Sequence, residues 1–204
     1  MTRFLAPVAL LAALLLAATP AAAAAAPPQR VVLAGGCFWG MQAVFEQLRG
    51  VRRVVAGYSG GSALSAHYEI VSTGLTGHAE SVEITYDPSR ISFAQILAIY
   101  FLVAHDPTQI DRQGPDDGRQ YRSEIFYATT AQQRVARETI ASLERRHVFS
   151  EPIVTTLAPL QAFYPAESYH QDFVAHHPDY PYVAINDLPK LRELRERFPQ
   201  LVKR

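Results

Sequence analysis

The chain has a single cysteine, Cys37, and the residues around it favour a reactive thiol. Cys37 follows the pair Gly35-Gly36 and precedes a segment whose apolar residues recur at helical spacing. The dipole and the free N–H groups of a helix N-terminus lower the pKa of a thiol and favour the thiolate. Glycines beside the sulfur let a substrate approach closely. The alternative is a small buried hydrophobic side chain, which is the usual role of a free cysteine.

Two aromatic residues, Phe38 and Trp39, follow the cysteine directly. Consecutive helical residues point about 100° apart, so the two rings cannot both face one patch of core. We expect one of them to line the surface beside Cys37 and to form an apolar wall there. The alternative is that both rings belong to the hydrophobic core.

Four further residues carry side chains that could donate or hold a proton near the thiol. Glu80 ends the sequence Gly77-His78-Ala79-Glu80, and a carboxyl group in an apolar pocket has a raised pKa and can act as a general acid. Tyr68 and Tyr121 would supply hydroxyl donors, and Asp116 lies in a long polar loop. From periodicity alone each also fits an ordinary role, as a strand-edge carboxylate, a half-buried strand aromatic or a solvated turn.

Cysteine count and histidine spacing predict no bound metal. One cysteine excludes an intramolecular disulfide framework, a cysteine-rich zinc site and a CxxC redox pair. A group of histidines and aspartates late in the chain matches no zinc spacing, and H-E-x-x-H is absent: His170, Asp172, His176, His177 and Asp179. The sequence also lacks Walker and G-x-G-x-x-G motifs, so we expect no nucleotide cofactor.

The charges of the chain are balanced, with 19 Lys and Arg against 19 Asp and Glu. A neutral chain has no strong field to attract nucleic acid or an anionic membrane. Its residues are 49% hydrophobic and 10% aromatic, which is enough for a folded core. We expect a monomer with one site and no nucleic-acid partner.

Residues 1–26 are predicted to be a secretory signal peptide. Arg3 gives a positive start, Phe4–Ala18 is an apolar run, Pro20 breaks it, and Ala21–Ala26 offers cleavage frames, with cleavage expected around Ala24–Ala26. The alternative, an uncleaved anchor, is disfavoured because a spanning helix needs about 20 apolar residues. We expect an exported protein, periplasmic or extracellular, whose domain is residues 27–204.

The remaining chain mixes strands and helices without strict alternation, which favours a two-layer α+β sandwich over a doubly wound sheet. Strands are predicted at Arg30–Leu33, Val51–Tyr58, Tyr68–Ser72, Ser81–Tyr86, Glu124–Ala128 and Ile153–Leu157. Helices are predicted at Cys37–Arg49, Phe93–Ala104 with Ser92 as cap, Thr130–His147 with Thr130 as cap, Ala166–His176 and an amphipathic tail Leu188–Phe198. Residues 105–121 read as a long polar loop, which in a compact domain is often functional.

Several short motifs, taken together, resemble the peptide methionine sulfoxide reductase A family. They cover residues 30–175 in the family's order: Gly36-Cys37-Phe38-Trp39-Gly40, Gly57-Tyr58-Ser59-Gly60-Gly61, Tyr68-Glu69-Ile70-Val71, Thr76-Gly77-His78-Ala79-Glu80, Tyr86-Asp87-Pro88, His105-Asp106-Pro107-Thr108, Arg112–Gly118, Gln120-Tyr121-Arg122-Ser123, Phe163–Glu167 and Tyr169-His170-Gln171. The resemblance implies a single domain in which a mixed sheet of the ferredoxin-like type packs against helices.

The resemblance also implies a reaction and a role for each candidate residue. Oxidised methionine in proteins would be the substrate, reduced without a bound cofactor. Cys37 would be the nucleophile and would become a sulfenic acid, while Phe38 and Trp39 would hold the S-methyl group. The other roles would fall to the proton donors: Glu80, Tyr68 and Tyr121 on the sulfoxide oxygen, and Asp116 in ordering the site.

The chain departs from the family in its C-terminal tail. Many members carry a second cysteine there, which resolves the sulfenic acid as a disulfide, but residues 178–204 contain none. The oxidised Cys37 would therefore need an external thiol, either a small thiol or a thioredoxin-like protein. Ala66-His67 and Pro115 are smaller departures that could alter the pocket rim.

Two other classes of protein remain open at this point. A cysteine hydrolase would also use a thiolate at a helix N-terminus, with His78 or His170 as its base. A non-catalytic exported binding protein could keep the fold without the chemistry.

Overall fold

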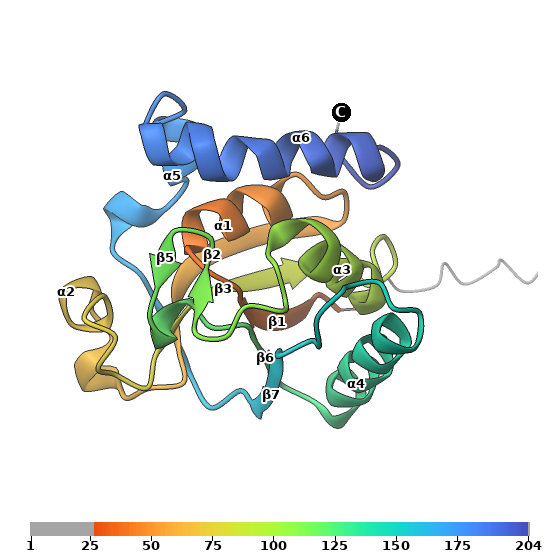
Figure 1. Ribbon diagram of the computed structural model, residues 1–204, viewed down its shortest axis with the longest axis horizontal. Helices are drawn as coiled ribbons and strands as arrows, with labels where there is room; N and C mark the ends of the chain where they lie inside the picture. Colours follow the sequence, from red (N-terminus) through yellow and green to blue (C-terminus); the bar gives the residue numbers. More distant parts are fainter. Residues whose placement is uncertain (1–26, 204) are drawn as a thin grey trace, which may run out of the picture.

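The computed structural model describes residues 27–203, so the predicted signal peptide lies outside the described residues. Within them the chain forms a six-stranded mixed sheet with the order β7-β6-β1-β3-β2-β8 (Figure 1). Its strands are β1 (Gln29–Ala34), β2 (Val51–Ser59), β3 (Ala79–Tyr86), β6 (Glu124–Tyr127), β7 (Thr156–Pro159) and β8 (Phe163–Pro165). All neighbouring pairs are antiparallel except β6 and β7.

Helices cover one face of the sheet. They are α1 (Phe38–Glu46), α3 (Phe93–Ile99), which continues as one π turn (Tyr100–Ala104), α4 (Thr130–Arg145) and α6 (Leu188–Arg197). Figure 1 shows α6 lying across α1, and Leu191 and Leu194 are the buried residues of its inner face. The opposite face of the sheet carries a smaller apolar cluster that includes Val32 and Phe126. The amphipathic tail predicted at Leu188–Phe198 thus packs on the domain through Leu191 and Leu194.

The predicted fold class is confirmed. The succession β1-α1-β2-β3-α3-β6 with the central order β6-β1-β3-β2 is the ferredoxin-like arrangement. Ser92 caps α3, because its hydroxyl accepts from the N–H of Gln95 while the Gln95 side chain accepts from the N–H of Ser92. The cap of α4 is Thr129 rather than the predicted Thr130, because it is Thr129 whose hydroxyl accepts from the N–H of Gln132.

The strand predicted at Tyr68–Ser72 is wrong, because these residues form one helical turn, α2 (Tyr68–Val71). Tertiary contact overrides the β-branched pattern there: the carboxylate of Glu167 accepts from the N–H of Tyr68 at 3.0 Å and satisfies the start of the turn. The long loop predicted at residues 105–121 is also more ordered than expected. It contains a two-stranded ribbon, β4 (Arg112–Gln113) with β5 (Asp116–Asp117), followed by the short 3-10 turn Arg119–Tyr121.

Two predictions near the C-terminus need correction. The helix predicted at Ala166–His176 is two short pieces, Ser168–His170 and α5 (Phe173–His176). The break comes at Gln171, whose side chain bonds to both the N–H and the carbonyl of Ala56 on β2. The strand predicted at Ile153–Leu157 begins later, as β7, because the N–H of Val154 is taken by the carbonyl of Pro107.

Candidate active site

Cys37 stands at the first turn of α1, where the chain leaves β1. Gly36 takes a positive φ of 89° in the connection, and a methyl group on it would lie 2.5 Å from Cγ of Gln113. Gln113 in turn bonds to the N–H and the carbonyl of Asp106. The cysteine is therefore positioned by a strand end and by the loop 105–121, not by the helix alone.

A cavity of about 200 Å³ opens at the thiol. Its lining contains all seven residues that the sequence analysis selected, brought together from five segments of the chain: Cys37, Phe38, Trp39, Tyr68, Glu80, Asp116 and Tyr121. Tyr180 and Tyr182 from the C-terminal tail complete the wall. The residues span positions 37 to 182, so only the folded chain assembles this site.

Glu80 is the buried acid of the cavity. It lies on β3, faces the helical layer and is only 2% exposed. The N–H of Phe38 donates to its Oε2 at 3.1 Å, but no cation pairs with it among the described residues. Burial raises the pKa of Glu80 to about 8, and the negative charge of Asp116 adds to this effect, against the lowering by the Phe38 N–H. At neutral pH Glu80 is therefore mostly a neutral acid with a proton to donate.

The expected low pKa of the thiol is wrong. Burial raises the pKa of Cys37 well above its usual value, and the nearby carboxyl groups of Glu80 and Asp187 raise it further. The N–H of Trp39 lowers the pKa, as a helix N-terminus should, but this effect is the smaller one. The local sequence reveals the helix start, but the carboxyl groups near it come from distant parts of the chain. The resting cysteine is therefore a neutral thiol.

Of the two aromatic residues after the cysteine, one belongs to the core and the other forms a wall beside the thiol, as expected. Phe38 is fully buried, and Trp39 is half-buried and stacks on Phe173, with ring centroids 3.7 Å apart. The indole N–H of Trp39 donates to Nδ1 of His170 at 3.1 Å. Because stacking and hydrogen bonding fix both ends of the ring, Trp39 is a rigid apolar surface beside the sulfur.

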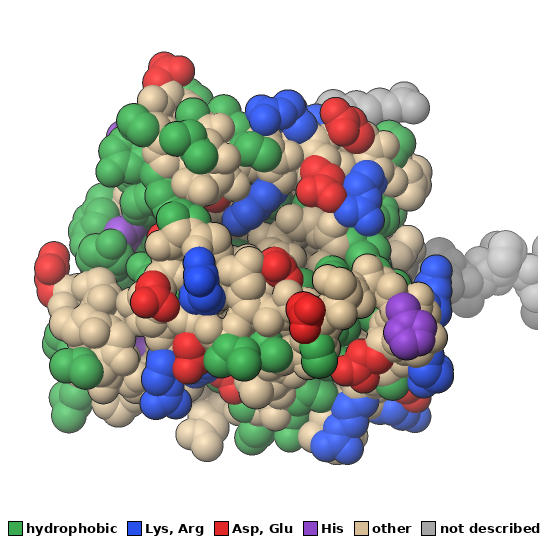
Figure 2. Space-filling view, in the orientation of Figure 1, with side chains coloured by type: hydrophobic (Ala, Val, Ile, Leu, Met, Phe, Trp, Pro, Cys, Tyr) green, Lys and Arg blue, Asp and Glu red, His purple; other side chains and the backbone are tan. Residues whose placement is uncertain are grey.

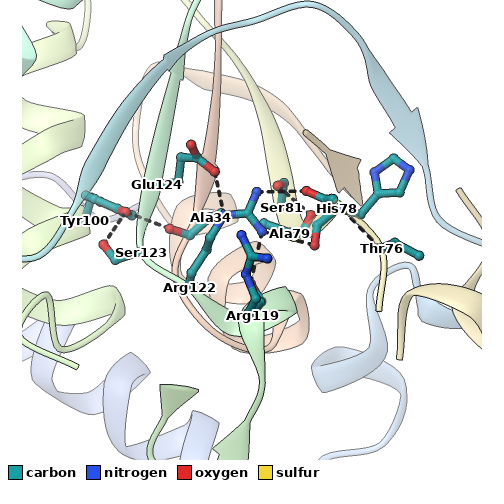
Figure 3. Close-up of polar contacts among 11 residues, drawn as sticks. Ala34, Thr76, His78, Ala79, Ser81, Tyr100, Arg119, Arg122, Ser123 and Glu124 are labelled. Atoms are coloured by element: carbon teal, nitrogen blue, oxygen red, sulfur yellow. Dashed lines mark hydrogen bonds and ion pairs between the residues drawn. The ribbon is translucent and has the colours of Figure 1, made fainter. Parts of the chain in front are cut away.

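Three hydrogen-bonded supports hold the segments that carry Tyr68, Glu80 and Tyr121. Glu167 accepts from the N–H of Tyr68 and, at 2.8 Å, from the hydroxyl of Tyr58. Arg122, next to Tyr121, donates to the carbonyls of Gly77 and His78 and to the carboxylate of Glu124 (Figure 3). The Gln120 amide bonds to the carbonyl of Ser72. Burial raises the pKa of Tyr68 to about 12, so its hydroxyl keeps its proton.

The tail supplies cavity residues that the sequence analysis did not select. The hydroxyl of Tyr182 donates to Oδ2 of Asp116 in a short hydrogen bond. Burial raises the pKa of Asp116, while this hydrogen bond and Lys190 oppose the rise. The signal available in the sequence was the pair Tyr180 and Tyr182 around Pro181, which lies just beyond the stretch of motifs.

A fully buried carboxyl group, Asp187, also comes from the tail. It lies against α1 at Gly40, where a Cβ would overlap its Oδ1. Its one charged partner is Lys190, with Nζ 3.7 Å from Oδ1. Burial raises the pKa of Asp187 to about 6, and Lys190 acts in the opposite direction. The ion pair lies within the tail, and the contact of Asp187 with Gly40 is what joins the tail to the helix that follows Cys37.

The two histidines considered as the base of a hydrolase lie outside the cavity. His78 and His170 are buried but do not line the cavity, and burial lowers the pKa of His170. A hydrolase would therefore lack its base beside Cys37. Across residues 27–203, His, Cys, Asp and Glu side chains form no group of three that could hold a metal ion. In the same range, no helix combines the length and the apolarity needed to cross a membrane.

The fold and cavity define a cysteine enzyme in which the thiol faces a neutral carboxylic acid. The chain belongs to the peptide methionine sulfoxide reductase family, whose sequence profile matches residues 29–201. It is 53% identical to the peptide methionine sulfoxide reductase MsrA 2 of Mesorhizobium japonicum over 170 residues, which are 83% of this chain and 87% of that one. It is 47% identical to the MsrA of Thermus thermophilus over 171 residues, or 84% and 96% of the two chains.

Solved structures agree with this assignment. Mxr1 from Saccharomyces cerevisiae in its reduced form superposes with a TM-score of 0.70 and 28% identity, covering 75% of this chain and 87% of that one. Methionine sulfoxide reductase A of Corynebacterium diphtheriae gives a TM-score of 0.69 and 33% identity, with 74% and 76% covered. The ferredoxin-like type and the family suggested by the sequence are both confirmed.

Proposed function

We propose that this protein reduces methionine S-sulfoxide in oxidised proteins, and in free form, to methionine. The observation that carries the proposal is the single cavity in which a thiol, a buried neutral carboxyl group and a rigid aromatic wall meet. The thiol can attack sulfur, and the acid can protonate the oxygen that leaves it. Sulfoxide reduction by a cysteine needs both functions in one place.

The reaction begins with the sulfoxide in the cavity. The Cys37 sulfur bonds to the oxygen-bearing sulfur. The oxygen then forms a bond to the cysteine sulfur, while its bond to the methionine sulfur and the new S–S bond both break, so that methionine leaves. Methionine sulfur gains two electrons, and Cys37 sulfur loses two as it becomes a sulfenic acid. Glu80 donates a proton to the oxygen as charge builds there, and the thiol proton of Cys37 replaces it, so that no proton is gained or lost overall.

The surrounding side chains have distinct roles in this proposal. Phe38 and Trp39 hold the methyl group of the substrate against an apolar surface. The hydroxyls of Tyr68 and Tyr121, which keep their protons because burial raises their pKa values, donate hydrogen bonds to the sulfoxide oxygen. Asp116 orders the cavity through its bond to Tyr182.

Recycling of the enzyme requires a thiol from outside. The sulfenic acid of Cys37 condenses with that thiol to a mixed disulfide and releases water, and a second thiol then restores Cys37 and leaves as a disulfide. With one cysteine in the chain no internal resolution exists. A small thiol or a thioredoxin-like protein fits this role; the yeast relative Mxr1 is known in a complex with Trx2.

The cellular location is also part of the proposal. The apolar run and alanine frames of residues 1–26 support export with cleavage near Ala24–Ala26. The protein would then repair methionine in an oxidising compartment, the periplasm or the exterior. N-terminal sequencing of the protein recovered from the cell envelope or the medium tests this, and an intact Met1 on the cell-associated protein would contradict it.

One turnover without reductant tests the chemistry. The mature protein is mixed with one equivalent of methionine S-sulfoxide, and methionine formed and free thiol lost are counted. We expect nearly one of each per chain, and neither with Cys37→Ser. No methionine from a folded protein with an intact thiol would contradict the proposal and favour the binding-protein interpretation. Ester hydrolysis without any thiol loss would favour a hydrolase.

A mixed disulfide tests the recycling step. After one turnover, the oxidised protein is mixed with a thioredoxin variant that lacks its second active-site cysteine, or with one equivalent of a small thiol. We expect an adduct at Cys37 by mass spectrometry. Sustained turnover without any such adduct would contradict direct attack by an external thiol.

A further inference from the structure

Most of the large apolar side chains that are exposed to solvent come from two segments of the chain that also line the Cys37 cavity. Figure 2 shows hydrophobic side chains gathered at the side of the molecule where α2 and α5 lie in Figure 1. Eight large hydrophobic residues are exposed among the described residues, and six of them lie in two segments, the excursion between β2 and β3 and residues 169–185, which supply Tyr68, Tyr180 and Tyr182 to the cavity. These six are called the apolar rim: Leu64, Ile70, Leu75, Tyr169, Tyr180 and Ile185. Such a concentration points to an interaction surface.

One side of the apolar rim lies on the excursion between β2 and β3, which carries Tyr68. Leu64 and Leu75 are 89% and 90% exposed, so neither contributes to the core. The end of the excursion is tied to the Tyr121 segment, because the Gln120 amide bonds to the carbonyl of Ser72 at 3.2 Å. Leu75 therefore belongs to a segment that is held against the Tyr121 segment, and its exposed side chain has no part in the core.

The other side of the apolar rim belongs to the C-terminal third. Tyr180 lines the cavity, and Ile185 is 71% exposed on the turn between Tyr182 and Asp187. Tyr169 joins the two sides: its ring packs on His170, with centroids 4.3 Å apart, and His170 contacts the ring of Tyr68 at the same distance. The rim is thus continuous with the aromatic wall of the site.

The chemistry of the mouth differs from one side to the other. Between Gly61 and Gly77 the only acidic or basic side chains are Glu69 and a single histidine, whereas residues 111–119 bring Asp111, Arg112, Asp117 and Arg119. A molecule bound over the mouth therefore meets two apolar sides and one charged side. Lysine and arginine are absent from both apolar segments, 61–77 and 178–186.

The occupant follows from the geometry of the reaction. Each residue of an extended chain advances about 3.3 Å, so a peptide with its oxidised methionine in the cavity must lay the neighbouring residues across the mouth. Resting on the proposed function, we propose that the apolar rim binds the residues that flank methionine sulfoxide in an exposed polypeptide segment. The protein then prefers oxidised methionines with leucine, valine or aromatic neighbours over those with acidic neighbours. Burying those apolar side chains supplies the preference.

The experiment compares three substrates. Two are acetylated, amidated pentapeptides with a central methionine S-sulfoxide, flanked by leucines or by glutamates, and the third is free methionine S-sulfoxide. We expect the wild-type protein to show a kcat/KM about tenfold higher for the leucine peptide than for the glutamate peptide, as one well-buried leucine can provide. The combined variant Leu64→Ser, Leu75→Ser, Ile185→Ser should lower this ratio to below about threefold.

Two controls separate docking from chemistry. Free methionine S-sulfoxide occupies the cavity, which none of the three substituted residues lines, so its turnover should be the same in the variant and the wild type. Val148→Ser removes a hydrophobic side chain that is 39% exposed after α4, away from the cavity, and should leave the peptide ratio unchanged. A variant that keeps the wild-type ratio, or that loses turnover of all three substrates equally, overturns the proposal.

Binding provides a readout that does not need turnover. Trp39 is the chain's single tryptophan and lines the cavity, so its fluorescence reports each peptide entering. If the wild type binds the leucine peptide but reduces nothing, the proposed function fails while the rim proposal stands. Equal binding of both peptides overturns the rim proposal. So does a variant whose only defect is a higher KM for a thioredoxin-like reductant, or the loss of self-association in sedimentation, because the rim then serves another partner.

Discussion

Two glutamates at the same end of the sheet have opposite surroundings. Glu80 on β3 and Glu124 on β6 lie on either side of the end of β1, which pairs with both strands. Side chains alternate across a strand, and Glu80 faces the helical layer while Glu124 faces the other side. Glu124 forms an ion pair of 2.7 Å with Arg122. Glu80 has one N–H donor and no cation among the described residues.

The two glutamates beside the end of β1 therefore differ in how fully their surroundings satisfy them. Arg122 spreads its donors over Glu124 and three carbonyl groups, so that each buried polar atom it faces has a partner (Figure 3). Around Glu80, burial without a cation raises the pKa and leaves a proton available. The side of Glu124 holds the segments in place, and the side of Glu80 is the one proposed to take part in the reaction.

The largest expected effect comes from breaking the satisfied side. Arg122→Met leaves Glu124 and three carbonyls without their donor, which should cost about 3 kcal/mol of unfolding free energy. Denaturant unfolding measures this cost. As a control, Arg134→Met removes an exposed pair with Glu138 and should change stability by less than about 0.5 kcal/mol. Equal losses in the two variants would show that the Arg122 network is not the support described here.

The next effect concerns the reacting side. Glu80→Gln keeps the shape of the acid but removes its proton, and should slow the single-turnover formation of methionine roughly 10²-fold. The free energy of unfolding should change little, because no ion pair is lost. An unchanged single-turnover rate would remove Glu80 from the mechanism.

The pH dependence follows from the same carboxyl group. Its folded pKa, about 8, is raised above the usual value, so the neutral acid is present below pH 8 and lost above it. The single-turnover rate should fall about tenfold per pH unit beyond that point. The stabilising effect of neutral Glu80 should be lost in the same direction, as pH rises from the unfolded value of 4.5 to 8. Glu80→Gln should show neither trend, and a persisting alkaline limb would assign it to another group.

The smallest expected effect comes from removing the hydroxyl group that donates a hydrogen bond to Asp116. Tyr182→Phe removes the hydroxyl that bonds Asp116, which raises the pKa of Asp116 and loosens the cavity wall. We expect a loss of roughly fivefold in kcat/KM, the order of one hydrogen bond. Tyr127→Phe, at the far end of β6, should have no such effect. A loss of stability without a loss of rate would make Tyr182 purely structural.

The sequence predicts the site better where chemistry is local. The helix start at Cys37, the aromatic wall and the buried acid follow from short motifs, and their placement in one cavity agrees with the structure. Tyr68 lies in the cavity as predicted, although its predicted strand is a helical turn, because the motif identifies the residue and does not depend on the element.

What failed depends on contacts across long sequence distances. The thiol pKa was expected to fall because the helix start is visible locally, whereas the carboxyl groups of Glu80 and Asp187 come from β3 and the tail. The roles of Tyr182 and Asp187 depend on α6 lying across α1, which no spacing reveals.

The tail also determines when, during synthesis of the chain, the site can be completed. Cys37 is made early in the chain, but Tyr180, Tyr182 and Asp187 belong to its last 25 residues. A nascent chain emerging amino end first therefore carries its thiol long before the wall that encloses it. The wall of the cavity is therefore complete only after the tail has been made, and a fragment cut before residue 180 would hold the thiol without Tyr180, Tyr182 and the buried Asp187.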